Sequence, residues 1–552
     1  MSWPFALAIV LAAGALVHWP SLRTFFAQDD VTFLARAMGL AATPWSLPRL
    51  LSTGLTWRAA YALFGLNPLP YHILNFVLHL TSAALIAAIG RRLGLRRGGS
   101  LVAALLFAAT PIAFTPTHWA SCIQEVLATV LALTAFWLWL AGRERGSTLL
   151  LWAGALAGVA AAMSKESTVL LPLVLVAANV GNTRAPSWKV IAPQAALIVA
   201  FVVTFTATVR SGNYLGGEAY SRDFSPGFLI ANFATYLRWC VSPHVPVPDL
   251  HAVANAAALP VGAIVVLVLT TLLWTTRKAP PHPEAVGVVW FLAMLAPVLP
   301  LAHHTYLYYL YLPWAGLCWA CAGAVERLAL RWPALRAAIV VLLVLLVALD
   351  SWSVRTREKE NVGPFAADKV VRESQLLKQC LSQLRSLNLA PGTPIAFVNP
   401  SNPRPDHDAT DSVVSYRPLE AALRDGEALR VFMPELRYVG FASSLPREWE
   451  DARVLLFNNR AYLVDFGTGS HALTNLGTFC IEVRDLAGAD SLFRRSRARG
   501  DTLPDATYGL VYTSDALGRH TEADRYAREF LQRWPDDRRA AYLDSLLRGS
   551  SK

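Results

Sequence analysis

The first 350 residues contain a series of long apolar stretches that are separated by short polar or basic segments. Stretches of about 17 to 25 apolar residues are long enough to cross the hydrocarbon core of a membrane as helices. We expect eleven such helices, near residues 3–20, 72–90, 100–116, 120–141, 147–163, 167–180, 190–209, 257–275, 286–301, 306–324 and 336–350. The pattern therefore predicts an all-α polytopic membrane domain over residues 1–350.

The basic residues between these stretches predict the orientation. Clusters occur at Arg91, Arg92, Arg96 and Arg97; Arg143 and Arg145; Arg184 and Lys189; Arg277 and Lys278; and Arg327, Arg331 and Arg336. All of them fall on one side of the eleven-helix arrangement, and basic loops stay in the cytoplasm. The N-terminus is then cytoplasmic and the chain after residue 350 lies outside. The apolar segment 228–241 would break this alternation if it spanned, so we expect a re-entrant or surface helix there.

Composition supports the membrane assignment. Of the 552 residues, 54% are hydrophobic and only 16% are charged, whereas soluble domains average about 25% charged residues. Residues 1–350 hold 21 Lys and Arg against 11 Asp and Glu, and the remainder holds 28 against 27. The excess positive charge is thus explained by the cytoplasmic loops, and no nucleic-acid partner is expected.

The first apolar stretch lacks the basic start and the small-residue cleavage site of a signal peptide. We expect it to remain as an uncleaved first span. The heavy use of Ala, Arg, Leu and Trp is typical of a bacterial protein from a GC-rich genome. The expected location is therefore the bacterial inner membrane, with the residues after 350 in the periplasm.

The periplasmic part is expected to contain a small α/β domain at 351–485 and a helical segment at 486–552. In the first we expect a helix at 369–387. Strands are expected at 395–399, 428–433, 454–458 and 461–466. Cys380 and Cys480 both lie in this part of the chain, so a disulfide between them is left open.

The helical segment resembles a tetratricopeptide repeat (TPR). Residues 505–536 match one repeat unit, and 487–498 supply a preceding helix. One repeat, or one and a half, cannot form a superhelix by itself. We therefore expect this segment to cap the soluble domain rather than to bind a peptide.

Two adjacent carboxylates, Asp29 and Asp30, follow the first span closely. A carboxylate beside hydrocarbon is costly unless it is hydrated, paired or used, which makes this pair the first candidate for chemistry. Cations and imidazoles are expected on the same outer face, at Arg36, Arg49, Arg58, Lys165, Arg210, Arg222, Arg238, His118, His303 and His304. This mixture of charges predicts a polar cavity on that face. The long first outer loop, residues 21–71, is rich in Leu, Trp and Phe and is expected to form interfacial helices.

Five segments, in order along the chain, resemble the GT-C superfamily of polyprenyl-phosphate-sugar glycosyltransferases, and most of all the membrane O-mannosyltransferases that carry TPRs and their bacterial relatives. The segments are Gln28-Asp29-Asp30, residues 67–75, residues 116–121 with Glu125, residues 163–167, and Tyr308 to Pro313. In the last segment the family has an acidic and a basic residue where this chain has Leu307 and Tyr308. The resemblance leaves open how the lipid phosphate is held here.

The resemblance implies a GT-C-like fold and an enzyme that transfers a sugar from a polyprenyl-phosphate donor to a periplasmic lipid, glycan or protein. A carboxylate takes the proton of the acceptor, and either Asp29 or Asp30 fits this role. The leaving phosphate needs cations. Its expected ligands are Lys165, Arg210 and Arg238, with His303 and His304 as further donors, and His118, Glu125, Glu166 and Tyr311 in support. The acid pair permits a divalent metal ion but does not require one.

A second class of function stays open, namely a transporter or a scaffold that presents the soluble domain. A transporter is expected to show internal repeats or symmetrically broken helices, and the sequence has none. A scaffold has no use for Asp29-Asp30 or for Lys165-Glu166. The lipid bilayer is a partner in every case.

Overall fold

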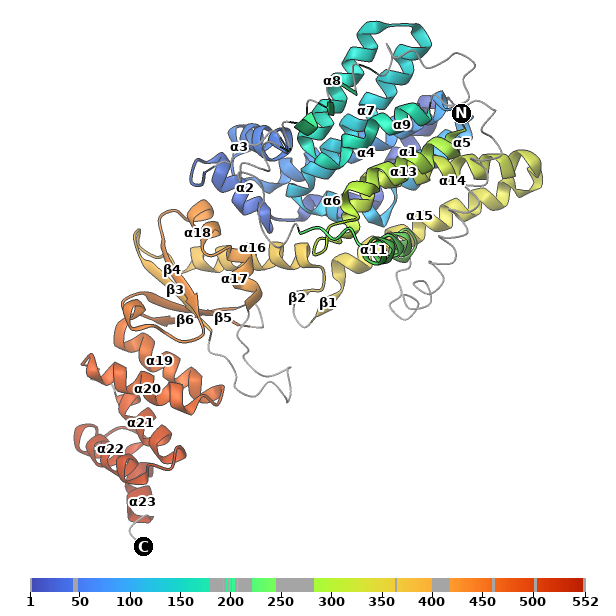
Figure 1. Ribbon diagram of the computed structural model, residues 1–552. Helices are drawn as coiled ribbons and strands as arrows, with labels where there is room; N and C mark the ends of the chain where they lie inside the picture. Colours follow the sequence, from blue (N-terminus) through green and yellow to red (C-terminus); the bar gives the residue numbers. More distant parts are fainter. Residues whose placement is uncertain are drawn as a thin grey trace. The chain divides into compact units, whose positions relative to one another are not determined.

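The computed structural model describes residues 2–42, 48–178, 221–244, 282–362, 365–399, 417–458, 462–500 and 504–549, together with isolated positions between 192 and 206. The chain divides into two compact units, Met1–Glu360 and Asn361–Lys552. Figure 1 shows the elements of each.

Unit 1 consists of helices in its described residues. The α-helices are α1 (Trp3–His18), α2 (Asp29–Ala37), α3 (Trp57–Phe64), α4 (Pro68–Arg92), α5 (Arg97–Ala108), α6 (Phe114–His118), α7 (Ile123–Arg145), α8 (Thr148–Ser164), α9 (Leu171–Ala177), α11 (Pro226–Trp239), α13 (Pro283–Leu295), α14 (Tyr311–Arg331) and α15 (Arg336–Lys359). Short turns of other helix types join them: η1 (Trp19–Arg23), η2 (Leu50–Thr56), η3 (Pro111–Ala113), η4 (Ala120–Cys122), η5 (Glu166–Leu170), η7 (Ser242–His244), η8 (Ala296–Val298), η9 (Leu307–Leu310) and η10 (Pro333–Leu335).

The apolar helices confirm that this is a membrane protein. By length and composition, four helices in the described residues can cross a membrane: Trp3–Arg23, Pro68–Arg92, Ala120–Arg145 and Pro333–Lys359. A fifth results if Arg97–Ala108 and Pro111–His118, which meet at a bend of 42°, form one span. Helices also occupy the other expected spans that lie in described residues. The expected spans 257–275 and, for the most part, 190–209 lie outside them, so the total of eleven remains a prediction.

Close helix packing forms the core of unit 1. Helix α7 packs against α4 and α8, and α14 packs against α5 and α13. A Cβ atom on Gly287 of α13 would come within 2.3 Å of the carbonyl oxygen of Gly316 of α14, which is the close approach that small residues permit between membrane helices. The indole nitrogens of the buried Trp290 and Trp319 donate to backbone carbonyls at 2.9 Å, those of Leu312 and Ile86. Both buried indole N–H groups therefore have a hydrogen-bond acceptor.

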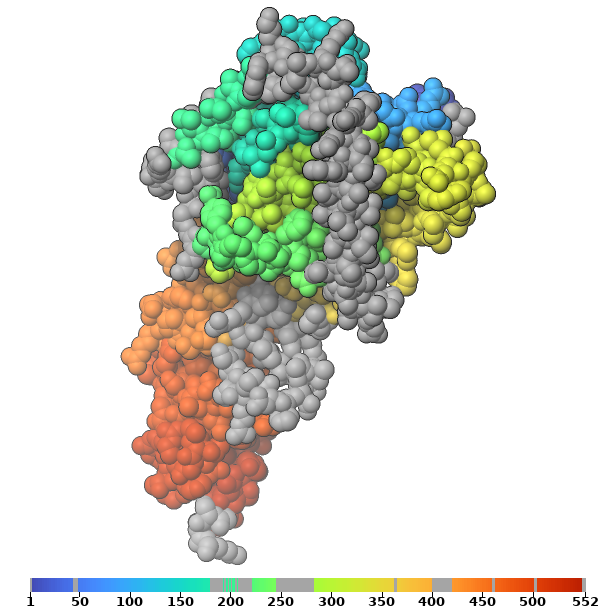
Figure 2. Space-filling view, turned by 45° about the vertical axis from the view of Figure 1, so that its right-hand side comes forward, coloured from blue at the N-terminus to red at the C-terminus, as the bar shows by residue number. Residues whose placement is uncertain are grey.

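The first outer loop folds into helices, as its composition predicts. Helices α2 and α3 pack against each other, and η2 packs against α7 and α8. The buried Trp57 of α3 lies against the rings of Phe26, Phe33 and Tyr71, with centroids 5.1 to 6.5 Å apart. This aromatic cluster fixes the loop against the start of α4. Helix α11 occupies the expected surface segment, and Figure 2 shows residues 221–244 in green on the exterior of unit 1.

Unit 2 contains a four-stranded sheet. Its strands are β3 (Pro394–Val398), β4 (Arg437–Ala442), β5 (Arg453–Phe457) and β6 (Leu463–Gly467), in the order β4-β3-β5-β6. Strand β3 is parallel to β4 and β5, and β6 is antiparallel to β5. A short hairpin, β1 (Asn361–Val362) and β2 (Phe365–Ala366), precedes it, and the helices are α16 (Lys369–Ser386), α17 (Arg417–Leu423) and α18 (Glu427–Phe432). The expected helix 369–387 and three of the four expected strands are confirmed.

The strand expected at 428–433 is wrong, because this segment is helix α18. Its buried residues, Ala428, Leu429, Val431 and Phe432, follow the spacing of one helix face, which a short apolar run does not reveal. The fourth strand of the sheet is instead β4, which the sequence did not predict. Its six residues are all only partly buried or exposed. Its Gly440 leaves room for Trp449, since a Cβ there would lie 2.2 Å from the indole ring.

Five helices complete unit 2: α19 (Gly469–Glu482), α20 (Leu486–Ala498), α21 (Pro504–Ala516), α22 (His520–Arg533) and α23 (Ala540–Gly549). Successive helices pack as hairpins. Ala472, Ala506 and Ala540 recur every 34 residues and are all buried, and 34 residues is the period of a TPR. The TPR assignment stays a prediction that this spacing favours. Cys380 and Cys480 are separate, buried free thiols, so they form no disulfide.

Candidate functional site

Asp30 is fully buried at the start of α2 and its carboxylate has three donors. Its Oδ2 accepts from the backbone N–H of Ala27 at 2.9 Å. Its Oδ1 accepts from the backbone N–H of Ser121 at 2.7 Å and from the Ser121 hydroxyl. Burial raises the pKa of Asp30 to about 7, although these hydrogen bonds act in the opposite direction. Asp30 thus ties the first outer loop to the start of α7.

Asp29 differs from its neighbour, because it is only half-buried. It is the first residue of α2, where the N–H groups of the first turn lack partners within the helix and favour negative charge. Of the two acids, Asp29 is the more exposed to solvent. Nothing in the sequence favours either acid as the base, whereas in the structure the two differ in burial.

The segment 116–121 is held from two sides. The side-chain amide of the buried Asn75 donates to the carbonyls of Pro116, Trp119 and Ala120 at 3.0 to 3.3 Å. The indole N–H of Trp119 donates to the carbonyl of Ala27 at 3.2 Å. This segment therefore joins α4 to the loop that carries the acid pair.

Lys165 lies in a buried ion pair with Glu125 at the start of α7. Its Nζ also lies over the rings of Tyr309 and Tyr308, 4.1 and 5.7 Å from their centroids. Glu125, which the sequence placed only in support, is thus the partner of a cation in the turn after α8. Trp119 lies edge-on to Tyr308, with centroids 6.0 Å apart, so this pair adjoins the segment that holds Asp30.

Glu166 faces a different partner. Both of its carboxylate oxygens accept from the guanidinium of Arg49, at 3.1 and 2.7 Å. The adjacent residues Lys165 and Glu166 thus connect the turn after α8 to α7, to the tyrosines before α14 and to the first outer loop.

Most of the other expected site residues that the structure describes have contacts with residues outside the expected site. His118 is buried, stacks on Phe114 and has its Nδ1 2.9 Å from the Phe114 carbonyl. The Tyr311 hydroxyl is 2.9 Å from Nδ1 of His79. Arg238 donates to Thr235 on its own helix, at 3.1 Å. His303 is exposed, and the His304 ring packs edge-on against Tyr306. Arg210 lies outside the described residues.

Sequence reasoning gave no role to Ser121, Asn75 and Trp119, and named Arg49 only among the outer cations. Their contacts join positions 41 to 117 residues apart in the chain, and a single sequence carries no signal for such pairings. Within the described residues no three acidic, His or Cys side chains group to hold a metal ion.

Comparisons with known proteins bear on the identity of this site. A family model described as dolichyl-phosphate-mannose-protein mannosyltransferase matches residues 52–209. The resemblance to the GT-C glycosyltransferases is confirmed. The mouse protein O-mannosyl-transferase TMTC3 is similar, with 30% identity over 149 residues, and the match covers 24% of this chain and 16% of the mouse protein. The match thus spans only about a sixth of that relative.

Two solved structures of an oligosaccharyltransferase from Archaeoglobus fulgidus are also similar. The apo form has a TM-score of 0.44 and 10% identity, and covers 82% of this chain and 65% of the other. The form tethered with an acceptor peptide has a TM-score of 0.44 and 9% identity, with 92% and 72% covered.

Proposed function

We propose that this protein is a membrane glycosyltransferase that moves a sugar from a polyprenyl phosphate to an acceptor on the outer face, with Asp29 as the general base. The acceptor is a lipid, a glycan or a protein. The observation that carries the proposal is the unequal environment of the acid pair. Asp30 is buried with donors on both oxygens, whereas Asp29 beside it is half-buried. The match to a mannosyltransferase family over residues 52–209 supports the reaction class.

In the proposed reaction the acceptor oxygen bonds to the anomeric carbon of the sugar as the bond from that carbon to the phosphate oxygen breaks. Asp29 takes the proton of the acceptor. The polyprenyl phosphate leaves as a dianion, which nearby cations stabilise. Lys165, Arg210 and Arg238, assisted by His303 and His304, remain the proposed ligands. Lys165 must exchange its contact with Glu125 for the phosphate, since the two are paired in this structure.

A divalent metal ion bound by both acids fits this geometry poorly. The two oxygens of Asp30 already accept three hydrogen bonds from Ala27 and Ser121. Three of the roughly four lone-pair positions of this carboxylate are therefore taken, which leaves it little capacity to bind a metal ion. We therefore assign Asp30 a positioning role.

The test measures sugar transfer by purified protein with a labelled polyprenyl-phosphate sugar. Asp29→Asn is expected to lower kcat by about 10²-fold to 10⁴-fold, the usual contribution of a general base. Asp30→Asn and Ser121→Ala are expected to cost less, because they loosen the loop without removing the base.

Melting temperatures of the variants serve as a control for folding. Full activity of Asp29→Asn would overturn the assignment of the base. Two results together would instead favour a transporter or a scaffold. The native chain would transfer no sugar from any donor offered, and the Asp29→Asn, Asp30→Asn double variant would fully complement a deletion strain.

A further inference from the structure

The first outer loop is fixed to the membrane helices at a second point, far along the chain from the Asp30 contact. Arg49 immediately precedes η2 and has a φ of 62°, a left-handed conformation that is uncommon for a residue with a side chain. From this position its guanidinium forms the two hydrogen bonds to Glu166. A planar guanidinium that binds both oxygens of a carboxylate fixes orientation as well as distance.

A hydroxyl contact lies beside this ion pair. The side chain of Ser52 is fully buried and donates to the carbonyl of Ser164, the last residue of α8, at 2.7 Å. The hydroxyl contact is buried and the ion pair is partly shielded from solvent, with the side chains of Arg49 and Glu166 16% and 27% exposed. We name Arg49, Ser52, Ser164 and Glu166 the loop clamp.

The clamp and the Asp30 contact hold elements that pack on one another. Helix α2 packs against η2 and α3, and η2 packs against α8. Asp29 therefore lies on a helix that Ser121 holds at its start and that packs on η2, which the clamp holds. A base must be held within a few tenths of an ångström of its target, and a displacement of about 1 Å can cost about 10²-fold in rate.

We propose that the bidentate pair of Arg49 with Glu166, supported by Ser52, is the positioning device that holds the first outer loop, and with it Asp29, in its reactive place. The inference rests on the proposed function for its kinetic part. Arg49 and Glu166 act through the loop and are positioning residues, not ligands of the donor phosphate. The role proposed for Arg49 therefore differs from that of the cations proposed to bind the phosphate.

The test is a charge reversal in the full-length protein. Arg49→Glu and Glu166→Arg are each expected to lower kcat by about 10-fold to 100-fold and to leave the KM for the donor within about twofold. The double reversal, Arg49→Glu with Glu166→Arg, is expected to have a kcat at least about tenfold higher than that of the less active single variant. Ser52→Ala is expected to show a smaller loss of kcat. Arg145→Glu is the matched control, because this exposed arginine has no ion pair among the contacts described for the chain.

A second readout does not depend on transfer. Hydrogen–deuterium exchange of peptides from residues 50–64 is expected to rise in either single reversal and to return toward the native level in the double reversal. If the native protein transfers no sugar, the proposed function fails while this exchange pattern still supports the clamp. Unchanged exchange in the single reversals would overturn the clamp, and so would a raised donor KM without recovery in the double reversal, since that result makes Arg49 a phosphate ligand.

Discussion

At the scale of single residues, the two adjacent aspartates have different surroundings although they are neighbours in the chain. Asp30 is fully buried and accepts hydrogen bonds from the main chain of Ala27 and from the main chain and hydroxyl of Ser121, whereas Asp29 is half-buried. Two acids that are equivalent in the sequence thus have different burial, and this difference is the basis of the roles proposed for them.

The surroundings of Asp30 predict a pH dependence of stability. Burial raises its pKa from 3.8 to about 7 in the folded protein, so between these values the folded state binds a proton that the unfolded state does not. The free energy of unfolding should therefore fall as pH rises from about 4 to 7, by a few kcal/mol at most, at about 1.4 kcal/mol per pKa unit. Asparagine does not titrate, so Asp30→Asn should lack this component.

The measurement is the apparent melting temperature, followed by tryptophan fluorescence in detergent between pH 5 and pH 8. Relative to Asp30→Asn, the native protein should lose stability over this range and level off above pH 7. Parallel curves for the two proteins would contradict the raised pKa.

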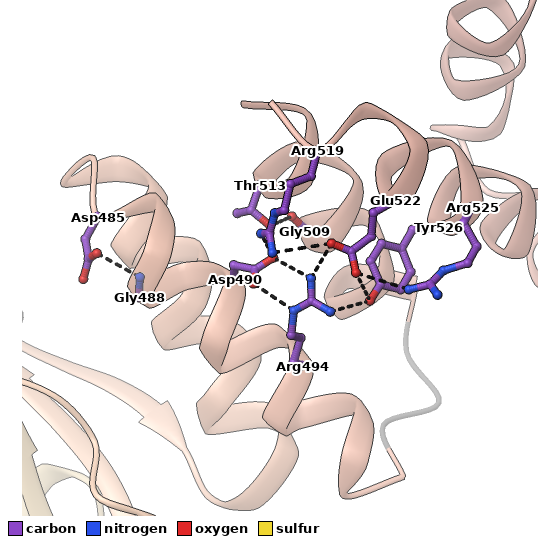
Figure 3. A network of polar contacts seen from close by, with 10 residues as sticks. All are labelled: Asp485, Gly488, Asp490, Arg494, Gly509, Thr513, Arg519, Glu522, Arg525 and Tyr526. Carbon is purple, nitrogen blue, oxygen red and sulfur yellow. Dashed lines mark hydrogen bonds and ion pairs between the residues drawn. The ribbon is translucent and has the colours of Figure 1, made fainter. Parts of the chain in front are cut away.

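At the scale of elements, side-chain networks hold helices together in both units. In unit 2, Asp490 of α20 accepts from Arg494 at 2.8 Å and pairs with Arg519 at 2.6 Å, and Arg494 also reaches Glu522 of α22 at 2.8 Å. Figure 3 shows these side chains converging, with Tyr526 beside them. Despite the desolvation caused by burial, the two arginines lower the pKa of Asp490.

This network predicts a local loss of stability. Asp490→Asn should destabilise the α20–α22 region by about 1 to 3 kcal/mol, because two arginines lose a charged acceptor. Because the folded pKa is lowered, the stabilisation is present at neutral pH and is lost as pH falls through that pKa.

Hydrogen exchange of peptides from residues 486–533 in the full-length protein provides the measurement. Asp544→Asn is the control, since it removes an exposed pair with Arg548 and exposed pairs contribute little. Equal exchange in the two variants would show that the Asp490 network contributes no more than a surface pair.

The elements also show how far the sequence was predictive. Long helices with strong apolar content, such as α4, α7 and α15, lie where the sequence placed them. The short segment at 428–433 is a helix where the sequence predicted a strand, because a run of six mostly apolar residues is too short to separate the two. Strand β4 was missed because its residues do not alternate between buried and exposed.

At the scale of the whole molecule, the apolar surface of α15 supports a membrane setting. Val340, Val341, Leu342 and Val344 are each more than half exposed in the isolated chain. Such a surface needs an apolar environment, and lipid supplies it. The orientation of the chain in that lipid remains a prediction from its basic loops.

This orientation predicts the outcome of thiol labelling in intact cells. In a background where Cys240 and Cys321 are serine, Arg145→Cys should react with a membrane-impermeant maleimide only after the cells are permeabilised. Glu448→Cys should react before. The background should be low, because the remaining native cysteines are buried; in unit 2, burial raises the pKa of the Cys380 and Cys480 thiols to about 12. The reverse pattern of labelling would invert the topology and place Asp29 on the cytoplasmic side.

The sequence by itself determined the membrane class, the positions of the long helices and the segments that resemble a glycosyltransferase superfamily. These follow from apolar length, loop charge and local motifs, which are properties of neighbouring residues. Only the tertiary structure separated Asp29 from Asp30 and paired Lys165 with Glu125 and Arg49 with Glu166. Burial and ion pairing depend on which distant segments meet, and that is decided by the packing of the helices.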